Sequence, residues 1–115
     1  MKQLYIYTIA ISCVFGISIG QVLFKIFSGH LSSENVMKAS NIVVLFAALF
    51  IYGAATVGWL LTLKYAPLSK IYPLMALAYI FVPTISCYFL HEHISFIYVI
   101  GILFIIIGII FTQVQ

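Results

Sequence analysis

The sequence has very little charge and no arginine. Its five lysines and two glutamates make up only 6% of 115 residues, whereas 65% of the residues are hydrophobic. A soluble domain needs far more charge on its surface, about a quarter of its residues on average. The net charge of +3 is also too dispersed for a nucleic-acid interface, which needs lysine and arginine clustered on one face. The composition therefore indicates an integral membrane protein surrounded by membrane lipids, and it excludes nucleic acid as a partner.

Motifs for catalysis, metals and cofactors are also missing. The sequence has no glycine-rich phosphate loop, no HExxH and no serine nucleophile motif. Its two cysteines, Cys13 and Cys87, each lie in an apolar run, where we expect small buried side chains rather than a disulfide or a metal pair. The cluster His91-Glu92-His93 is a weak metal candidate, because neighbouring residues at a helix end point in different directions. We therefore expect no enzyme, no cofactor and no metal.

The sequence does contain four long apolar runs. A hydrocarbon core about 30 Å thick requires roughly 20 apolar residues for each helical crossing. The runs are continuous, whereas the strands of a membrane β-barrel alternate apolar and polar residues. The sequence predicts an all-α polytopic membrane protein with a single domain over residues 1–115, whose transmembrane helices span about 4–27, 41–64, 69–90 and 96–113.

The third predicted helix contains two prolines. Pro73, next to Tyr72, and Pro83 each remove a backbone hydrogen bond and are expected to kink the helix. In lipid, the freed carbonyl groups need protein or water as partners. We therefore expect both prolines to border a cavity that is open to one side and lined by the first and third helices, with Tyr79 and Trp59 near it.

Small residues recur on two of the helices. Ser12, Gly16 and Gly20 are four positions apart in the first helix, and Gly101 and Gly108 are seven apart in the fourth. Such stripes let helix backbones approach closely in lipid, where no hydrophobic force drives association. The fourth helix is otherwise almost wholly apolar, so it suits contact with another helix better than the lining of a polar path. The Gly101/Gly108 stripe predicts a dimer interface.

The lysines near the membrane ends are candidates for binding a phosphate. Lys25 shares a helix face with Gln21, one turn deeper, and an ammonium beside an amide can hold a phosphate group. Lys64 and Lys70 fall at the opposite membrane face. The alternative for each lysine is snorkelling, in which the ammonium extends to the hydrated interface. For Gln21 the alternative is a hydrogen bond to a neighbouring helix backbone.

Glu92 is the candidate carboxylate at a membrane end. It is expected either to contact a polar head group of a substrate or to gate the path, together with Tyr72, Trp59 and Tyr79. The alternative is a solvated charge at a helix end, or a local partner for a lysine. The distribution of lysines, three near the end that holds both termini and two near the other, only weakly favours cytoplasmic termini.

Several motifs together resemble those of the small flippase subunits for undecaprenyl-phosphate aminoarabinose. Gly20-Gln21 followed by Lys25 matches a GQxxxK motif. The other matches, in chain order, are Trp59-Leu60-Leu61, Leu63, Pro67, Tyr72-Pro73-Leu74, His91-Glu92, Ser95, Gly101 and Gly108. Each motif is loose, but their order and spacing are fairly specific, and they extend along nearly the whole chain apart from residues 28–40.

The resemblance implies a fold and a function. These subunits belong to the drug/metabolite transporter superfamily together with the small multidrug resistance exporters. The implied protein is a dimeric four-helix bundle in the bacterial inner membrane. It would translocate a polyprenyl-phosphate-linked sugar for modification of envelope glycan or lipid A. The identity of the sugar, the membrane orientation, the energy source and the choice between a homodimer and a heterodimer with a similar small subunit stay open.

Two other functions are compatible with parts of the sequence. A proton-coupled exporter of lipophilic cations has the same helix count, but such exporters carry a membrane-embedded glutamate in the first helix. From Leu4 to Phe24 this sequence has no carboxylate that could titrate within the membrane. A helper subunit that stabilises a membrane enzyme is the third possibility, and it would need no polar residue at membrane depth.

Overall fold

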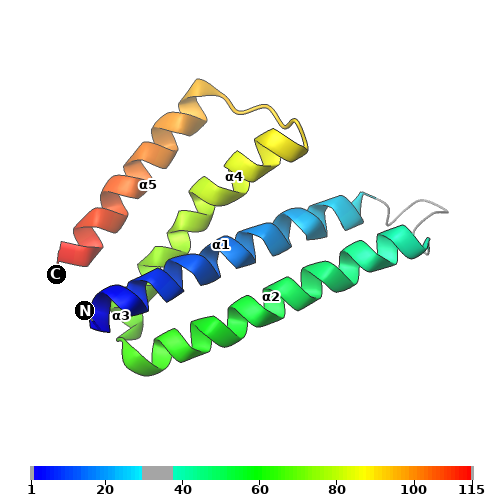
Figure 1. Cartoon of the computed structure of the whole chain (residues 1–115). Helices are drawn as coiled ribbons and strands as arrows, with labels where there is room; N and C mark the ends of the chain where they lie inside the picture. Colours follow the sequence, from blue (N-terminus) through cyan, green and yellow to red (C-terminus); the bar gives the residue numbers. More distant parts are fainter. Residues whose placement is uncertain (1, 30–37, 115) are drawn as a thin grey trace.

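The computed structural model describes residues 2–29 and 38–114, and these are almost entirely helical (Figure 1). Four segments are long and apolar enough to cross a membrane: Gln3–Ser28, Ala39–Tyr65, Leu68–Phe89 and Phe96–Val114. The predicted all-α polytopic fold is therefore confirmed. The helical elements are α1 (Lys2–Ser28), α2 (Ala39–Tyr65), α3 (Leu68–Ile71), the 3-10 helix η1 (Tyr72–Leu77), α4 (Ala78–Phe89) and α5 (Phe96–Val114).

Pro67 sets the tight connection between the second and third spans. Ala66, at the end of α2, is extended with φ −143° and ψ 149°, because a following proline disfavours the helical conformation. The carbonyl oxygen of Pro67 then accepts hydrogen bonds from the backbone N–H groups of Lys70 and Ile71, both at 3.1 Å. The chain thus reverses direction within a few residues and begins α3 with a satisfied backbone.

The third span is divided rather than uniform. Pro73 lies in the first turn of η1, and the backbone keeps 3-10 geometry from Tyr72 to Leu77. A run of this length is unusual, since 3-10 helices rarely exceed three or four residues. Pro83, in contrast, lies inside α4 without ending it. The two prolines therefore have different effects: the helix type changes around Pro73, whereas α-helix continues through Pro83.

Helices α1 and α2 run side by side in opposite directions and form the main packed unit (Figure 1). Small residues make this contact possible. A Cβ added to Gly16 would lie 3.2 Å from the Cβ of Ala55, and a Cβ added to Gly58 would lie 2.6 Å from the Sγ of Cys13. Gly20 faces α2 in the same way, whereas Ser12, the first member of the predicted stripe, is exposed.

The buried core is small and lies where α1, α2 and the start of the third span meet. Its buried members are Ala10, Cys13, Val14, Trp59, Ile71 and Leu74. Cys13 is a buried free thiol, as expected, but Cys87 is exposed, because α4 has less protein packed around it than α1 has. The expectation that both cysteines are buried was wrong for Cys87.

The single chain has an open shape. Its radius of gyration is 16.2 Å, compared with about 13 Å for a compact domain of 100 residues. Helix α5 contains no buried residue, and its main contact within the described part of the chain is with η1. A long apolar helix with so little cover must face lipid or another protein.

We predict that Gly58→Ala destabilises the protein because it forces a methyl group against Cys13. Overpacking of this kind typically costs about 1–3 kcal/mol, which exceeds the gain of up to about 1 kcal/mol from replacing glycine by alanine in a helix. Thermal unfolding followed by circular dichroism in detergent would measure the loss.

The matched control is Gly53→Ala, because a Cβ added to Gly53 meets nothing within 4 Å. This variant should be as stable as the parent protein or slightly more so. In a Cys13→Ala background, Gly58→Ala should lose most of its cost. Equal stability of the Gly58→Ala and Gly53→Ala variants would contradict the described contact between α1 and α2.

Candidate functional site

Polar side chains gather at both ends of the bundle, and the first group lies where the two chain termini meet. Lys70 Nζ donates a hydrogen bond to the main-chain carbonyl oxygen of Gln113 at 3.0 Å. Gln113 Nε2 in turn donates to the carbonyl oxygen of Lys70, also at 3.0 Å. This reciprocal pair fastens the last turn of α5 to α3.

Two cavities flank the Lys70 side chain. One has a volume of about 440 Å³ and is lined by Gln3, Tyr7, Ile11, Lys70, Leu74 and Gln113. The other has a volume of about 180 Å³ and shares Gln3, Tyr7 and Lys70 with the first. Lys70 is half-buried between them. The junction of α1, α3 and α5 is therefore a hollow with a cationic group in its wall.

The second polar group lies at the opposite end, between α4 and α5. Ser86 is buried, and its Oγ donates a 2.6 Å hydrogen bond to Oε2 of Glu92. Both residues line a cavity of about 340 Å³, together with Val82, Pro83, His93, Ile94, Ser95 and Tyr98. Glu92 is thus turned back toward the helical hairpin, although its side chain keeps an exposed surface.

The turn that brings Glu92 to Ser86 has an unusual backbone. His91 has a φ of 56°, in the left-handed region that glycine normally occupies at the end of a helix. A residue with a Cβ costs about 1 kcal/mol in this conformation. The backbone N–H of Leu90 donates to the carbonyl oxygen of Ser86 at 2.8 Å and closes the last turn of α4. The chain then reverses, which carries Glu92 to the Ser86 hydroxyl.

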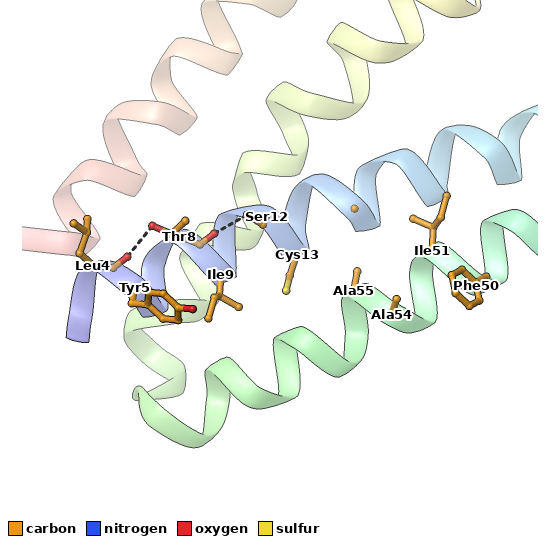
Figure 2. A pocket seen from close by; sticks show the side chains of 11 residues that line it. Leu4, Tyr5, Thr8, Ile9, Ser12, Cys13, Phe50, Ile51, Ala54 and Ala55 are labelled. Carbon is orange, nitrogen blue, oxygen red and sulfur yellow. Dashed lines mark hydrogen bonds between the residues drawn. The ribbon is translucent and has the colours of Figure 1, made fainter. Parts of the chain in front are cut away.

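An apolar groove lies along the α1–α2 pair, and Figure 2 shows the side chains of both helices that line it. Its volume is about 730 Å³, and small residues, among them Gly16, Ala54 and Ala55, leave room for it. The hydroxyl groups of Thr8 and Ser12 donate to the carbonyl oxygens of Leu4 and Thr8, at 2.9 and 2.8 Å. Because the polar groups are satisfied within α1, the groove presents an apolar surface suited to hydrocarbon.

Three of the predicted phosphate-binding residues lie apart from these cavities. Gln21 and Lys25 are exposed near the end of α1, and neither side chain is hydrogen-bonded to another residue of the described segments. Lys64 is exposed at the end of α2, with its Nζ 5.4 Å from the centroid of the Tyr65 ring. The structure brings only Lys70, the fourth predicted residue, into a polar cavity.

The aromatic residues expected at the substrate path are not gathered in one place. Trp59 is buried in the core, whereas Tyr72 and Tyr79 are 61% and 60% exposed. Pro83 was expected to border a cavity between the first and third helices. It instead lines a cavity between α4 and α5. A cavity does lie between α1 and the third span, but Lys70 and Leu74 line it there rather than Pro73 or Pro83.

The predicted interface glycines have free space around them. A Cβ added to Gly101 or to Gly108 would meet nothing within 4 Å. Both glycines lie on α5, which is the least covered of the four spans. This surface is available for contact with lipid or with a second subunit.

Sequence reasoning missed four residues that complete the two polar groups. Gln3, Tyr7 and Gln113 line the Lys70 cavity, and Ser86 holds Glu92. Gln113 carried a detectable signal, because it is an amide at the end of a helix that is otherwise strongly apolar. Ser86 precedes Glu92 by six residues, a spacing without a regular meaning on a helix. Its role depends on the turn at His91.

These observations define a class of protein. Four apolar helices span the described chain, its charged side chains lie near the two ends, and no group of three metal-ligating side chains occurs among the described residues. This arrangement is typical of a small multi-pass transporter. The chain belongs to the EamA-like transporter family, whose sequence profile matches residues 3–114.

Named relatives agree with the resemblance noted in the sequence and confirm it. The chain is 34% identical over 122 residues to a probable 4-amino-4-deoxy-L-arabinose-phosphoundecaprenol flippase subunit ArnF of Proteus mirabilis, an alignment that covers 95% of this chain and 90% of the relative.

Two further relatives match shorter stretches. A probable ArnF subunit of the same flippase from Photorhabdus laumondii is 37% identical over 71 residues, which cover 60% of this chain and 56% of the relative. A probable ArnE subunit from Enterobacter sp. is 36% identical over 63 residues, which cover 55% of this chain and 59% of the relative. No solved structure matches significantly.

We predict that Ser86→Ala lowers the stability of the α4–α5 hairpin. The hydrogen bond to the carboxylate is short, but Glu92 is exposed, so loss of the bond should cost about 1 kcal/mol, less than the roughly 1.5–3 kcal/mol typical of charged partners. Thermal unfolding in detergent measures the effect.

Thr84→Val is the control for this substitution. The Thr84 hydroxyl lies on the same helix but donates only to the carbonyl oxygen of Ile80, so its removal should leave the melting temperature nearly unchanged. If both variants melt at the same temperature as the parent, the Ser86–Glu92 bond does not contribute to the fold.

Proposed function

We propose that this chain is one subunit of a flippase in the bacterial inner membrane that moves a polyprenyl-phosphate-linked sugar between leaflets. The observation that carries the proposal is the 34% identity to the Proteus mirabilis flippase subunit along 95% of this chain. The motifs that suggested the same function in the sequence extend over nearly the same length. The translocated sugar would be used to modify envelope glycan or lipid A.

The distribution of charge supports transport of an anion. A phosphate cannot cross hydrocarbon unaided, because transfer of a charge into a medium of low dielectric is very costly. Lys25 with Gln21 lies at one membrane end, and Lys64 with Lys70 lies at the other. We infer that these cations receive the phosphate at the two faces. The isoprenoid tail meanwhile stays in lipid and passes along apolar surfaces such as the α1–α2 groove.

Glu92 is proposed to contact the sugar. Its carboxylate is held by Ser86 beside a 340 Å³ cavity, and it accepts hydrogen bonds when ionised. A sugar hydroxyl or an amino group would be a suitable donor. A carboxylate at this position would also repel the phosphate, which favours a fixed orientation of the head group. Tyr72 and Tyr79 are exposed on the third span, which also holds Ser86, and we retain them as candidate contacts along the path.

The function requires a second subunit. The open chain encloses little volume, and α5 has no buried residue. We propose that a similar small subunit, either a second copy or a related chain, packs on α5 at Gly101 and Gly108. The relatives include subunits of two types, ArnF and ArnE, and this supports a heterodimer in particular.

Replacing Gly101 and Gly108 by isoleucine is predicted to dissociate the dimer. The branched side chains would hold the two α5 backbones apart, whereas glycine lets them approach closely. Cross-linking in native membranes, with the candidate partner co-expressed, would report the loss. Gly53→Ile is the control, because Gly53 on α2 is also exposed. Undiminished cross-linking of the double variant would rule out this interface.

Lys25→Ala is predicted to abolish delivery of the lipid-linked sugar to the far leaflet while expression and dimerisation persist. The reason is that the phosphate would lose its cation at one face. Transfer of the sugar onto its periplasmic acceptor is the measurement, and Lys38→Ala, an exposed lysine at the same end, is the control. Full activity of Lys25→Ala, or equal loss in both variants, would reduce Lys25 to a snorkelling residue.

A further inference from the structure

We propose that the 440 Å³ cavity between α1, α3 and α5 is a binding site for the phosphate of a lipid-linked sugar, with the ammonium group of Lys70 as its cation. The inference rests on the proposed function and deepens it, because it assigns a built site to one face of the membrane. It also adds Gln3, Tyr7 and Gln113 as site residues.

The electrostatic state of Lys70 is the first argument. Its ammonium group has three N–H protons, and within residues 2–29 and 38–114 the structure shows one acceptor for them, the Gln113 carbonyl oxygen. No carboxylate of the described chain pairs with Lys70, since Glu92 is bonded to Ser86 at the opposite end. A half-buried cation without an anionic partner is costly near lipid. A phosphate oxygen in the adjoining cavity would compensate for this charge.

The Gln113 amide provides the second argument. Its Nε2 group donates to the carbonyl oxygen of Lys70 and, at 3.3 Å, to the hydroxyl of Thr112, and these acceptors fix which end of the amide is the nitrogen. Its Oε1 atom is consequently an acceptor, and it is buried without a hydrogen-bond partner among the described residues. Such an atom normally has a donor. Because the terminal torsion of glutamine is broad, rotation of the amide would present Oε1 to a sugar hydroxyl in the cavity that Gln113 lines.

The shape and depth of the cavity fit a lipid head group. Leu74, which is buried, and Ile11 supply apolar wall, while Gln3, Tyr7 and Lys70 supply polar groups. The site lies at the end of the spans, where the chain termini meet (Figure 1). The ends of transmembrane helices reach the membrane interface, which is where the phosphate of a membrane lipid resides. The volume is within the range of about 300–1,000 Å³ that small-molecule sites occupy.

A purely structural role for Lys70 makes a different prediction. In that role the ammonium group only caps the last turn of α5 by bonding to the Gln113 carbonyl oxygen, and any hydrogen-bond donor would serve. Lys70→Gln keeps a donor and removes the charge. Lys70→Arg keeps both. The two substitutions therefore separate capping from phosphate binding.

The test is binding of undecaprenyl phosphate to the purified full chain, measured by native mass spectrometry in detergent. We expect Lys70→Gln to weaken binding about tenfold or more, because hydrogen bonds to a charged group are lost. Lys70→Arg should restore it. Lys38→Gln is the control, since Lys38 is exposed, lines neither cavity and is not among the lysines proposed to receive the phosphate. Undecaprenol, which has the same tail without phosphate, should bind equally to all variants.

Several outcomes would overturn the site. Unchanged binding in Lys70→Gln, or equal loss in Lys38→Gln, would show that Lys70 has no particular role. A parallel loss of undecaprenol binding would show damage to the fold. Competition by inorganic phosphate at the same concentration as the lipid would assign the site to free phosphate, and equal competition by phosphatidylglycerol would assign it to anionic lipid in general. Binding and transport are separate measurements. If the chain binds the lipid phosphate in a charge-dependent way but does not flip the lipid, the proposed function is refuted and this site still stands.

Discussion

The low dielectric of the membrane interior is the constraint on which the rest of this structure depends. Backbone groups cannot remain unpaired in lipid, so the chain crosses as helices, and serine and threonine hydroxyls bond to carbonyl groups one turn back, as Ser18 and Thr62 do. Charged side chains are confined to the two ends. Between these ends the spans pack through small residues such as Gly58, because shape complementarity replaces the hydrophobic effect as the source of helix association.

Much of the fold could be predicted from the sequence because the same constraint determines the pattern. Four apolar runs of membrane length leave few alternatives, and Pro67 marks the connection between the second and third spans. The different behaviour of Pro73 and Pro83 was not predictable. A proline removes one hydrogen bond at either place, but whether the helix type changes depends on the packing of the surrounding chain. The burial of Cys13 and the exposure of Cys87 likewise depend on which helices are neighbours.

The candidate site was only partly predictable. Lys70 and Glu92 stand out in the sequence as rare charges near membrane ends, whereas their partners Gln113 and Ser86 do not. Gln113 lies 43 residues from Lys70 in the chain, so their pairing exists only once α5 has returned to α3. Trp59 shows another limit, because a tryptophan near a helix end suggests an interfacial or substrate-facing ring, and the sequence does not show that it packs in the small core with Cys13. Burial of that kind is a tertiary property.

The central claim is that this chain helps a phosphate-linked sugar to cross the membrane. The most direct measurement uses proteoliposomes that contain an undecaprenyl-phosphate-linked sugar with a chemically labelled head group, and an impermeant reagent that destroys the label in the outer leaflet. Without protein, about half of the label should stay protected. The account predicts that this chain, reconstituted with its partner subunit, exposes nearly all of the label to the reagent. Continued protection of the inner-leaflet pool, with both subunits folded and paired, would contradict it.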